Sequence, residues 1–206
     1  MRRHLSLNPR KQPSQRRSRE TVAVILEAAA RILAKDGLAG FNTNAVAERA
    51  GVSVGSIYQY FPNKDALTLS LIEKFERELL ETVRMAAKAA RGRGLGTALN
   101  LFVCGLLEAH GRRAELNRLL EAEEERLRRH LPDQNAVREL NRILRSLLVE
   151  NRAGLSVAIT SSVVQDLITI ARAMSDEALL GGTPPAAVQR RIFRAIWGYL
   201  FCGPAD

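Results

Sequence analysis

Aromatic residues and cysteine are scarce in this sequence. Phe, Trp and Tyr make up only 5% of the 206 residues, and there are two cysteines, Cys104 and Cys202. Two lone cysteines in apolar surroundings argue against a disulfide framework, so we expect reduced core thiols in a cytoplasmic protein. The three histidines, His4, His110 and His130, do not have metal-ligand spacing. The sequence therefore predicts no metal site.

Long apolar runs are also missing. No window approaches the about 18 uninterrupted apolar residues of a membrane span, and no apolar segment follows the basic N-terminus as in a secretory signal. There is no alternating strand pattern and no internal repeat. We find no H-E-x-x-H, Walker loop or G-x-S-x-G, and no nucleophile paired with a base. The sequence therefore favours neither a membrane protein nor an enzyme, and it implies no cofactor.

Basic and helix-forming residues are what the chain has in abundance. Its 31 Lys and Arg residues outnumber 22 Asp and Glu residues, which gives a formal net charge of +9. A charge of this sign and size suggests a polyanionic partner. Hydrophobic residues make up 46% of the chain, and Ala, Leu and Arg are frequent, which favours helices over strands. We expect an all-α fold.

The first segment, residues 1–18, has the composition of a basic arm with almost nothing to bury. Two interpretations stay open: a solvated tail, or an arm that follows DNA phosphates or enters a minor groove. The cations of this segment and its border are Arg2, Arg3, Arg10, Lys11, Arg16, Arg17 and Arg19.

Helical spacing of apolar residues predicts a first helix over about 19–36, with Ser18 as its N-cap and Gly37 as its stop. Capping residues mark three more helices. These run from Asn42 or Thr43 to Gly51, over about 54–60 after Ser53, and onward from Asn63. Beyond residue 90, breaks at glycine and proline separate further helices. They cover about 95–110, 112–130, 133–152, 156–178 and 185–201.

Two groups of polar residues in this second part have open interpretations. Cys104 and His110 interrupt an apolar helix and are either satisfied core residues or pocket lining. A run of glutamates precedes several arginines, and the i,i+4 pairs Glu124–Arg128 and Glu125–Arg129 predict a solvated, salt-bridged face. The alternative is an acidic mouth that attracts a ligand. The sequence identifies no ligand contact.

The second and third helices have the spacing of a helix-turn-helix. Such a motif needs a small residue where the helices cross, a glycine in the turn and an apolar residue that seals the pair. Ala47, Gly51 and Ile57 meet these requirements. A generic helical hairpin can satisfy the same three points, so the exposed side of the third helix carries more information.

With Ile57 buried, the other side chains of the third helix are left on its outer faces. Small residues at its start allow close approach to a duplex, and its N-terminal N–H groups favour phosphate. Tyrosine hydroxyls can donate to phosphate oxygens, Gln59 can reach a base edge, and Val54 can touch a thymine methyl. The outward residues are Ser53, Val54, Gly55, Ser56, Tyr58, Gln59 and Tyr60.

Lys64 lies in the first turn of the fourth helix, where the helix dipole disfavours a cation. A phosphate between the lysine and the helix terminus would explain this placement. The alternative is an ordinary solvent-exposed lysine.

The stretch TNAVAERAGVSVGSIYQYFPNKDAL, residues 43–67, resembles the signature of the TetR/AcrR (tetracycline-repressor) family. Ala28 and Ala29 followed by Gly37 fit the same pattern, and the resemblance covers about 18–68. It implies a three-helix DNA-binding head, residues 19–68, joined to a larger helical ligand-sensing and dimerisation body, residues 69–206. It also implies that Phe61 is a core residue.

The resemblance further implies which residues meet DNA. It assigns contact to Thr43, Ser53, Val54, Gly55, Tyr58, Gln59, Tyr60 and Lys64, and we add Ser56 from the outward face. Family members are homodimers, which implies an interface on the helices near 156–178 and 185–201. The alternative for those helices is core packing within one subunit.

These inferences combine into one leading hypothesis. We expect a ligand-responsive transcriptional regulator, a repressor, that binds a palindromic double-stranded operator as a homodimer and responds to a small, partly apolar effector. The alternative is a non-specific DNA-binding architectural protein, which the positive charge supports equally well.

Overall fold

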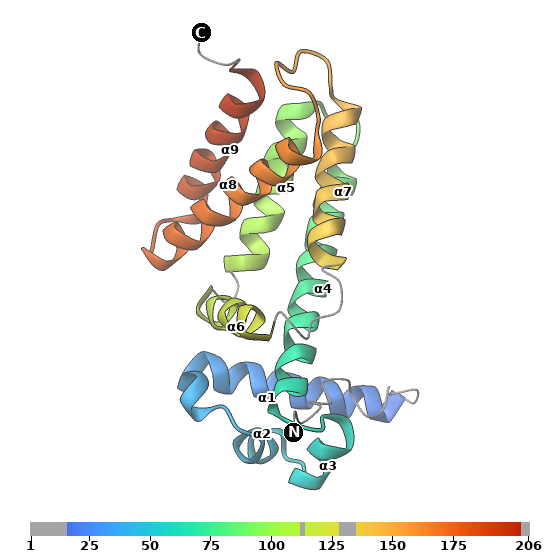
Figure 1. Ribbon diagram of the computed structural model, residues 1–206, viewed down its shortest axis with the longest axis vertical. Coiled ribbons are helices and arrows are strands. Elements are labelled where there is room, and N and C mark those ends of the chain that lie inside the picture. The colour runs from blue at the N-terminus through green and yellow to red at the C-terminus, as the bar shows by residue number, and fades with distance from the viewer. Residues whose placement is uncertain (1–15, 112–113, 128–134, 203–206) are drawn as a thin grey trace, which may run out of the picture. The chain divides into compact units, whose positions relative to one another are not determined.

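The computed structural model describes residues 16–111, 114–127 and 135–202, which form helices and contain no strand (Figure 1). The all-α prediction is confirmed. The elements are α1 (Arg16–Gly40), α2 (Thr43–Ala50), α3 (Val54–Tyr60), α4 (Lys64–Ala90), α5 (Leu95–Gly111), α6 (Ala114–Leu127), α7 (Asn135–Glu150), α8 (Ser161–Leu180) and α9 (Pro185–Phe201). Within the described ranges, no helix has the length and apolar character needed to cross a membrane.

The helices pack into two compact units. The head unit contains α1, α2, α3, the first part of α4 as far as Phe75, and α6. The body unit contains the rest of α4 together with α5, α7, α8 and α9. The inclusion of α6 in the head unit was not expected from the sequence.

Local capping explains where the helices of the head unit begin. The side-chain oxygens of Asn42, Ser53 and Asn63 each accept a hydrogen bond from a backbone N–H three residues later, at 2.9, 3.0 and 2.8 Å. The caps at Ser53 and Asn63 are confirmed, and of the two candidates Asn42 and Thr43 the structure selects Asn42. These bonds satisfy N–H groups that a helix start otherwise leaves unpaired.

The first helix differs from its prediction at its start. It begins at Arg16 rather than near residue 19, so Ser18 lies inside the helix and is not its cap. The helix is interrupted where expected, because Gly37 has φ 62° and ψ −165°, and a short helical segment then continues to Gly40. Apart from its last three residues, the predicted arm falls outside the described residues.

The core of the head unit draws on every helix of that unit. Its fully buried side chains follow the apolar spacing that the sequence showed in the first four helices. Members of the cluster are Ile25, Ala29, Leu33, Phe41, Val46, Ala47, Ile57, Phe61, Leu67, Leu71, Leu116 and Leu120. The last two come from α6, so this helix completes the hydrophobic core of the head unit.

The body unit is held by close helix packing. Gly105 in α5 lies against α4, and a Cβ at this position would be 3.1 Å from the Ala86 Cβ and 3.5 Å from the Val83 Cα. Elsewhere in the unit, the Tyr199 hydroxyl donates a hydrogen bond to Asp166 at 2.6 Å and joins α9 to α8. This bond raises the pKa of Tyr199, because the neutral phenol is the form that donates.

The helix predicted over 156–178 begins later than expected, at Ser161. Residues 151–160 form a loop, so Val157, Ala158 and Thr160 do not lie on a helix face. Ser156 in this loop donates through its backbone N–H to the Leu200 carbonyl at 3.0 Å and through its hydroxyl to the Phe201 carbonyl at 2.9 Å. These bonds to the end of α9 replace the intrahelical bonds that a longer α8 would make.

The expectation of core thiols is wrong, because Cys104 and Cys202 are both exposed. Cys104 interrupts the apolar pattern of α5 because it lies on the outer side of that helix. His110 is half-buried, and its Nδ1 lies 2.9 Å from the carbonyl oxygen of Leu106 in the same helix.

We predict that Gly105→Val destabilises the protein by about 1–3 kcal/mol, because a branched side chain must displace α4 from α5. Thermal unfolding followed by circular dichroism measures the change. Cys104→Val is the matched control, since it places the same side chain on the exposed side of α5 and is expected to leave the midpoint nearly unchanged. Equal midpoints for the two variants would contradict this description of the helix contact.

Candidate nucleic-acid interface

The turn between α2 and α3 has the geometry of a helix-turn-helix. Gly51 ends α2 in the left-handed conformation, with φ 67° and ψ 31°, a region that costs other L-residues about 1–2 kcal/mol. The Val52 N–H donates to the Ala47 carbonyl at 3.0 Å and closes the turn. Ala47 and Ile57 are buried where the helices meet, so the predicted three-point pattern is confirmed.

A pair of hydroxyl groups joins the outer edges of the two helices. Thr43 begins α2 and Tyr58 lies in α3, and their hydroxyl oxygens are 3.3 Å apart and share a hydrogen bond. The Tyr58 side chain is 43% exposed. Gln59 follows it in the chain and is also exposed. Tyr58 and Gln59 are thus exposed on the helix-turn-helix, with the half-buried Thr43 bonded to Tyr58.

The first turn of α3 is built from small residues. Ser53 and Gly55 are exposed, and the hydroxyls of Ser53 and Ser56 are 2.8 Å apart. A Cβ on Gly55 would meet only the Ser53 Oγ, at the ordinary contact distance of 3.7 Å. Gly55 is helical and does not have a positive φ. Neither packing nor backbone conformation within the chain therefore requires a glycine at this position.

Five of the predicted contact residues are less exposed than expected, because Thr43, Val54, Ser56, Tyr60 and Lys64 are all half-buried. Val54 and Tyr60 are half-buried and pack against the head-unit core, and the Tyr60 hydroxyl donates to the Ser18 Oγ at 3.3 Å. Lys64 is also half-buried: its Nζ lies 3.5 Å from the Leu38 carbonyl oxygen and 5.0 Å from the centroid of the Phe41 ring. These contacts account for a cation at the start of α4 without a phosphate.

An ion-pair network fixes α6 to the start of α4 within the head unit. The Arg126 guanidinium is 2.5 Å from the Asp65 carboxylate and 2.7 Å from Glu123. Glu123 is only 7% exposed. The hydrogen bond to Glu123 is the largest cause that raises the pKa of Arg126 above its ordinary value, and the hydrogen bond to Asp65 is the second. Asp65 directly follows Lys64, so this network borders the predicted DNA-contact residues.

The predicted salt-bridged face of the glutamate run is only partly described. Arg128 and Arg129, the expected partners of Glu124 and Glu125, lie outside the described residues. Glu123 is buried and paired with Arg126 at i,i+3, so at this position a fully solvated face is wrong. The i,i+3 spacing was visible in the sequence, but the contact with Asp65 was not.

Residues 25–71 match the family model of bacterial regulatory proteins of the tetR family. This segment contains the whole helix-turn-helix and the hydroxyl pair of Thr43 and Tyr58. The helix-turn-helix head of this chain is thus of the TetR type.

Curated relatives match about a third of the chain. It is 44% identical over 69 residues to the HTH-type transcriptional repressor KstR of Mycolicibacterium smegmatis, a match that covers 33% of this chain and 34% of KstR. It is 32% identical over 74 residues to the fatty acid metabolism regulator protein of Bacillus subtilis, which covers 32% of this chain and 38% of that protein. The match therefore spans little more than a third of either relative.

Solved structures extend the likeness to most of the chain. A TetR transcription regulator from Haloarcula marismortui has a TM-score of 0.68 and 16% sequence identity, and the match covers 88% of this chain and 97% of that one. At this identity the likeness concerns the fold. A helix-turn-helix head with a larger helical body is thus the fold of this chain.

We predict that Arg126→Met lowers the free energy of unfolding by about 1–2 kcal/mol, because it leaves the buried Glu123 carboxylate without its charged partner. Arg126 itself is half-exposed, so solvent screening limits the direct strength of the pair. Urea denaturation of Arg126→Met and Arg118→Met compares this site with an exposed arginine on the same helix. A loss of equal size in both variants would show that the network contributes nothing specific.

Proposed function

We propose that this protein is a ligand-responsive transcriptional repressor that binds a palindromic DNA operator as a homodimer. The observation that carries the proposal is the exposed edge of a TetR-family helix-turn-helix, where Thr43 and Tyr58 share a hydrogen bond beside Gln59. Hydroxyls and amides of this kind suit phosphate oxygens and base edges.

Each contact residue has a role that follows from its chemistry and placement. Thr43 and Tyr58 position the head on phosphates, and Gln59 reads a base edge. The small exposed residues Ser53 and Gly55 let the backbone of α3 approach the duplex. Lys64 adds a cation at the border of the interface, while Val54, Ser56 and Tyr60 support the helix from partly buried positions.

The proposed dimer uses α8 and α9. Trp197 on α9 is 36% exposed and stacks with Phe193 and Phe201 at centroid distances of 5.4 and 4.4 Å. Such an aromatic surface suits burial against a second copy. Two heads related by a two-fold axis would read half-sites about 34 Å apart, in successive major grooves.

Effector response would pass through α4, the helix that contributes to both units. An effector that binds one arrangement of α4 more tightly than another shifts the population of DNA-competent dimers. The two relatives, a repressor and a fatty acid metabolism regulator, each match only about a third of this chain. We therefore propose a small, partly apolar effector without naming it.

A regulator of this kind works where the chromosome is, so we propose a cytoplasmic location. We also propose that the protein has no enzymatic activity.

The deciding experiment is selection of binding sites from random duplex DNA with the full chain at near-physiological salt. A recovered palindrome with two equivalent half-sites supports the proposal. Comparable affinity for unrelated duplexes, lost as salt rises, would instead identify a non-specific architectural protein.

We predict that Gly55→Ala weakens operator binding by about tenfold or more, an energy of at least 1.4 kcal/mol, because the added methyl group holds α3 away from the duplex. The same substitution should raise stability by about 0.5–1 kcal/mol, since Gly55 is helical and alanine has the better helix propensity. Fluorescence anisotropy and thermal unfolding measure the two effects. Full affinity in a folded Gly55→Ala variant would exclude close approach at this residue.

We predict that Lys64→Gln weakens binding to all DNA sequences and reduces the slope of log affinity against log salt by about one. Lys88→Gln, which removes an exposed lysine in the last turn of α4, is the control with the same change in net charge. If both variants change the slope equally, the effect comes from overall charge and Lys64 makes no phosphate contact.

A further inference from the structure

A cavity lies in the body unit between the end of α7 and the loop that leads to α8. It has a volume of about 540 Å³, within the range of about 300–1,000 Å³ that small-molecule sites occupy. It is open to solvent, and six of its seven lining residues have aliphatic side chains. The lining residues are Val149, Arg152, Ala153, Leu155, Val157, Ala158 and Ile159.

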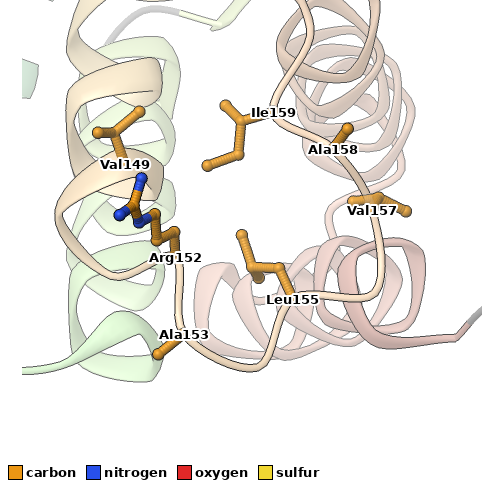
Figure 2. A pocket seen from close by; sticks show the side chains of 7 residues that line it. All are labelled: Val149, Arg152, Ala153, Leu155, Val157, Ala158 and Ile159. Carbon is orange, nitrogen blue, oxygen red and sulfur yellow. The ribbon is translucent and has the colours of Figure 1, made fainter.

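Aliphatic side chains converge on the open space of this cavity (Figure 2). Leu155 and Ile159 point into it from two parts of the loop, and Val149 faces it from α7. The Val149 side chain is 47% exposed, so it stays in contact with water in the chain alone. An apolar ligand would remove this surface from water, which stabilises the bound state.

The loop that forms the wall is fixed by hydrogen bonds. Ser156 is tied to the Leu200 and Phe201 carbonyls at the end of α9. Gly154 turns the chain with a φ of 84°, and the Leu155 N–H donates to the Arg152 carbonyl at 3.4 Å. The cavity is therefore largely formed before any ligand enters, which lowers the entropic cost of binding.

Arg152 is the charged residue of the lining, and its guanidinium lies on the α7 side of the cavity (Figure 2). It is exposed and makes no ion pair with any described residue. Glu150, two residues before it, accepts a hydrogen bond from Ser146 at 3.1 Å. A guanidinium with five N–H donors beside aliphatic side chains matches one carboxylate attached to an aliphatic chain.

We propose that this cavity binds an aliphatic monocarboxylate, with its chain against Val149, Leu155 and Ile159 and its carboxylate on Arg152. A single cation in the lining favours a ligand with one negative charge over a polyanion. The site is distinct from the DNA interface, and its occupation is measured without DNA. Failure of this proposal and failure of operator binding are therefore separate outcomes.

Isothermal titration of the full chain with decanoate, below the concentration at which decanoate forms micelles, tests the site. We expect saturable binding that Arg152→Gln weakens about fivefold, the loss given by an exposed ion pair. The control Arg145→Gln removes an exposed arginine from α7 outside the lining and should leave decanoate affinity unchanged. Decanol, which lacks the charge, should bind wild type and Arg152→Gln equally.

A second variant tests the apolar wall. Val149→Asn should weaken decanoate and decanol alike, and the exposure of Val149 means that the fold survives the change. No saturable decanoate binding, or equal affinity in wild type and Arg152→Gln, would overturn the proposal. A third result would also overturn it: sedimentation velocity shows that Val149→Asn dissociates an oligomer, and decanoate does not bind. The cavity would then be a contact between copies of the chain.

Discussion

The left-handed conformation of Gly51 is the constraint on which the proposed DNA-facing surface depends. It turns the chain within the three residues that separate α2 from α3, so that Ala47 and Ile57 meet in the core. Once those two side chains are buried, the opposite edges of α2 and α3 must face outward together. The shared hydrogen bond between Thr43 and Tyr58 follows from that placement. A side chain at position 51 would strain the turn and disturb both the core and the surface.

The head unit is stabilised by a helix from the second half of the chain. Leu116 and Leu120 enter the core built by the first four helices, and Arg126 pairs with Asp65 in the first turn of α4. The apolar spacing of α6 shows that one face is buried. It does not show against which partner, because any apolar surface of suitable shape satisfies the same pattern. The assignment of α6 to the head unit therefore needed the tertiary structure.

The differences between sequence and structure have a common cause in bonds between distant residues. The small and β-branched residues after Ser156 are compatible with a helix, but carbonyls at the end of α9 take the Ser156 donors and hold the segment as a loop. Tyr60 looked free on the outer side of α3, yet it packs on the core and its hydroxyl donates to Ser18. Each contact joins residues more than forty positions apart, a distance at which a local pattern carries no information.

The sequence by itself determined the helical class, the caps at Ser53 and Asn63, and the helix-turn-helix with Tyr58 and Gln59 on its exposed side. Those features depend on side chains within one or two turns of each other, which local propensity and spacing specify. Only the tertiary structure decided the packing of α6 on the head, the partners of Lys64 and Tyr60, and the cavity beside Arg152. The reason is physical: an apolar face or a hydrogen-bond donor can be satisfied by many partners, and only the packed chain selects one of them.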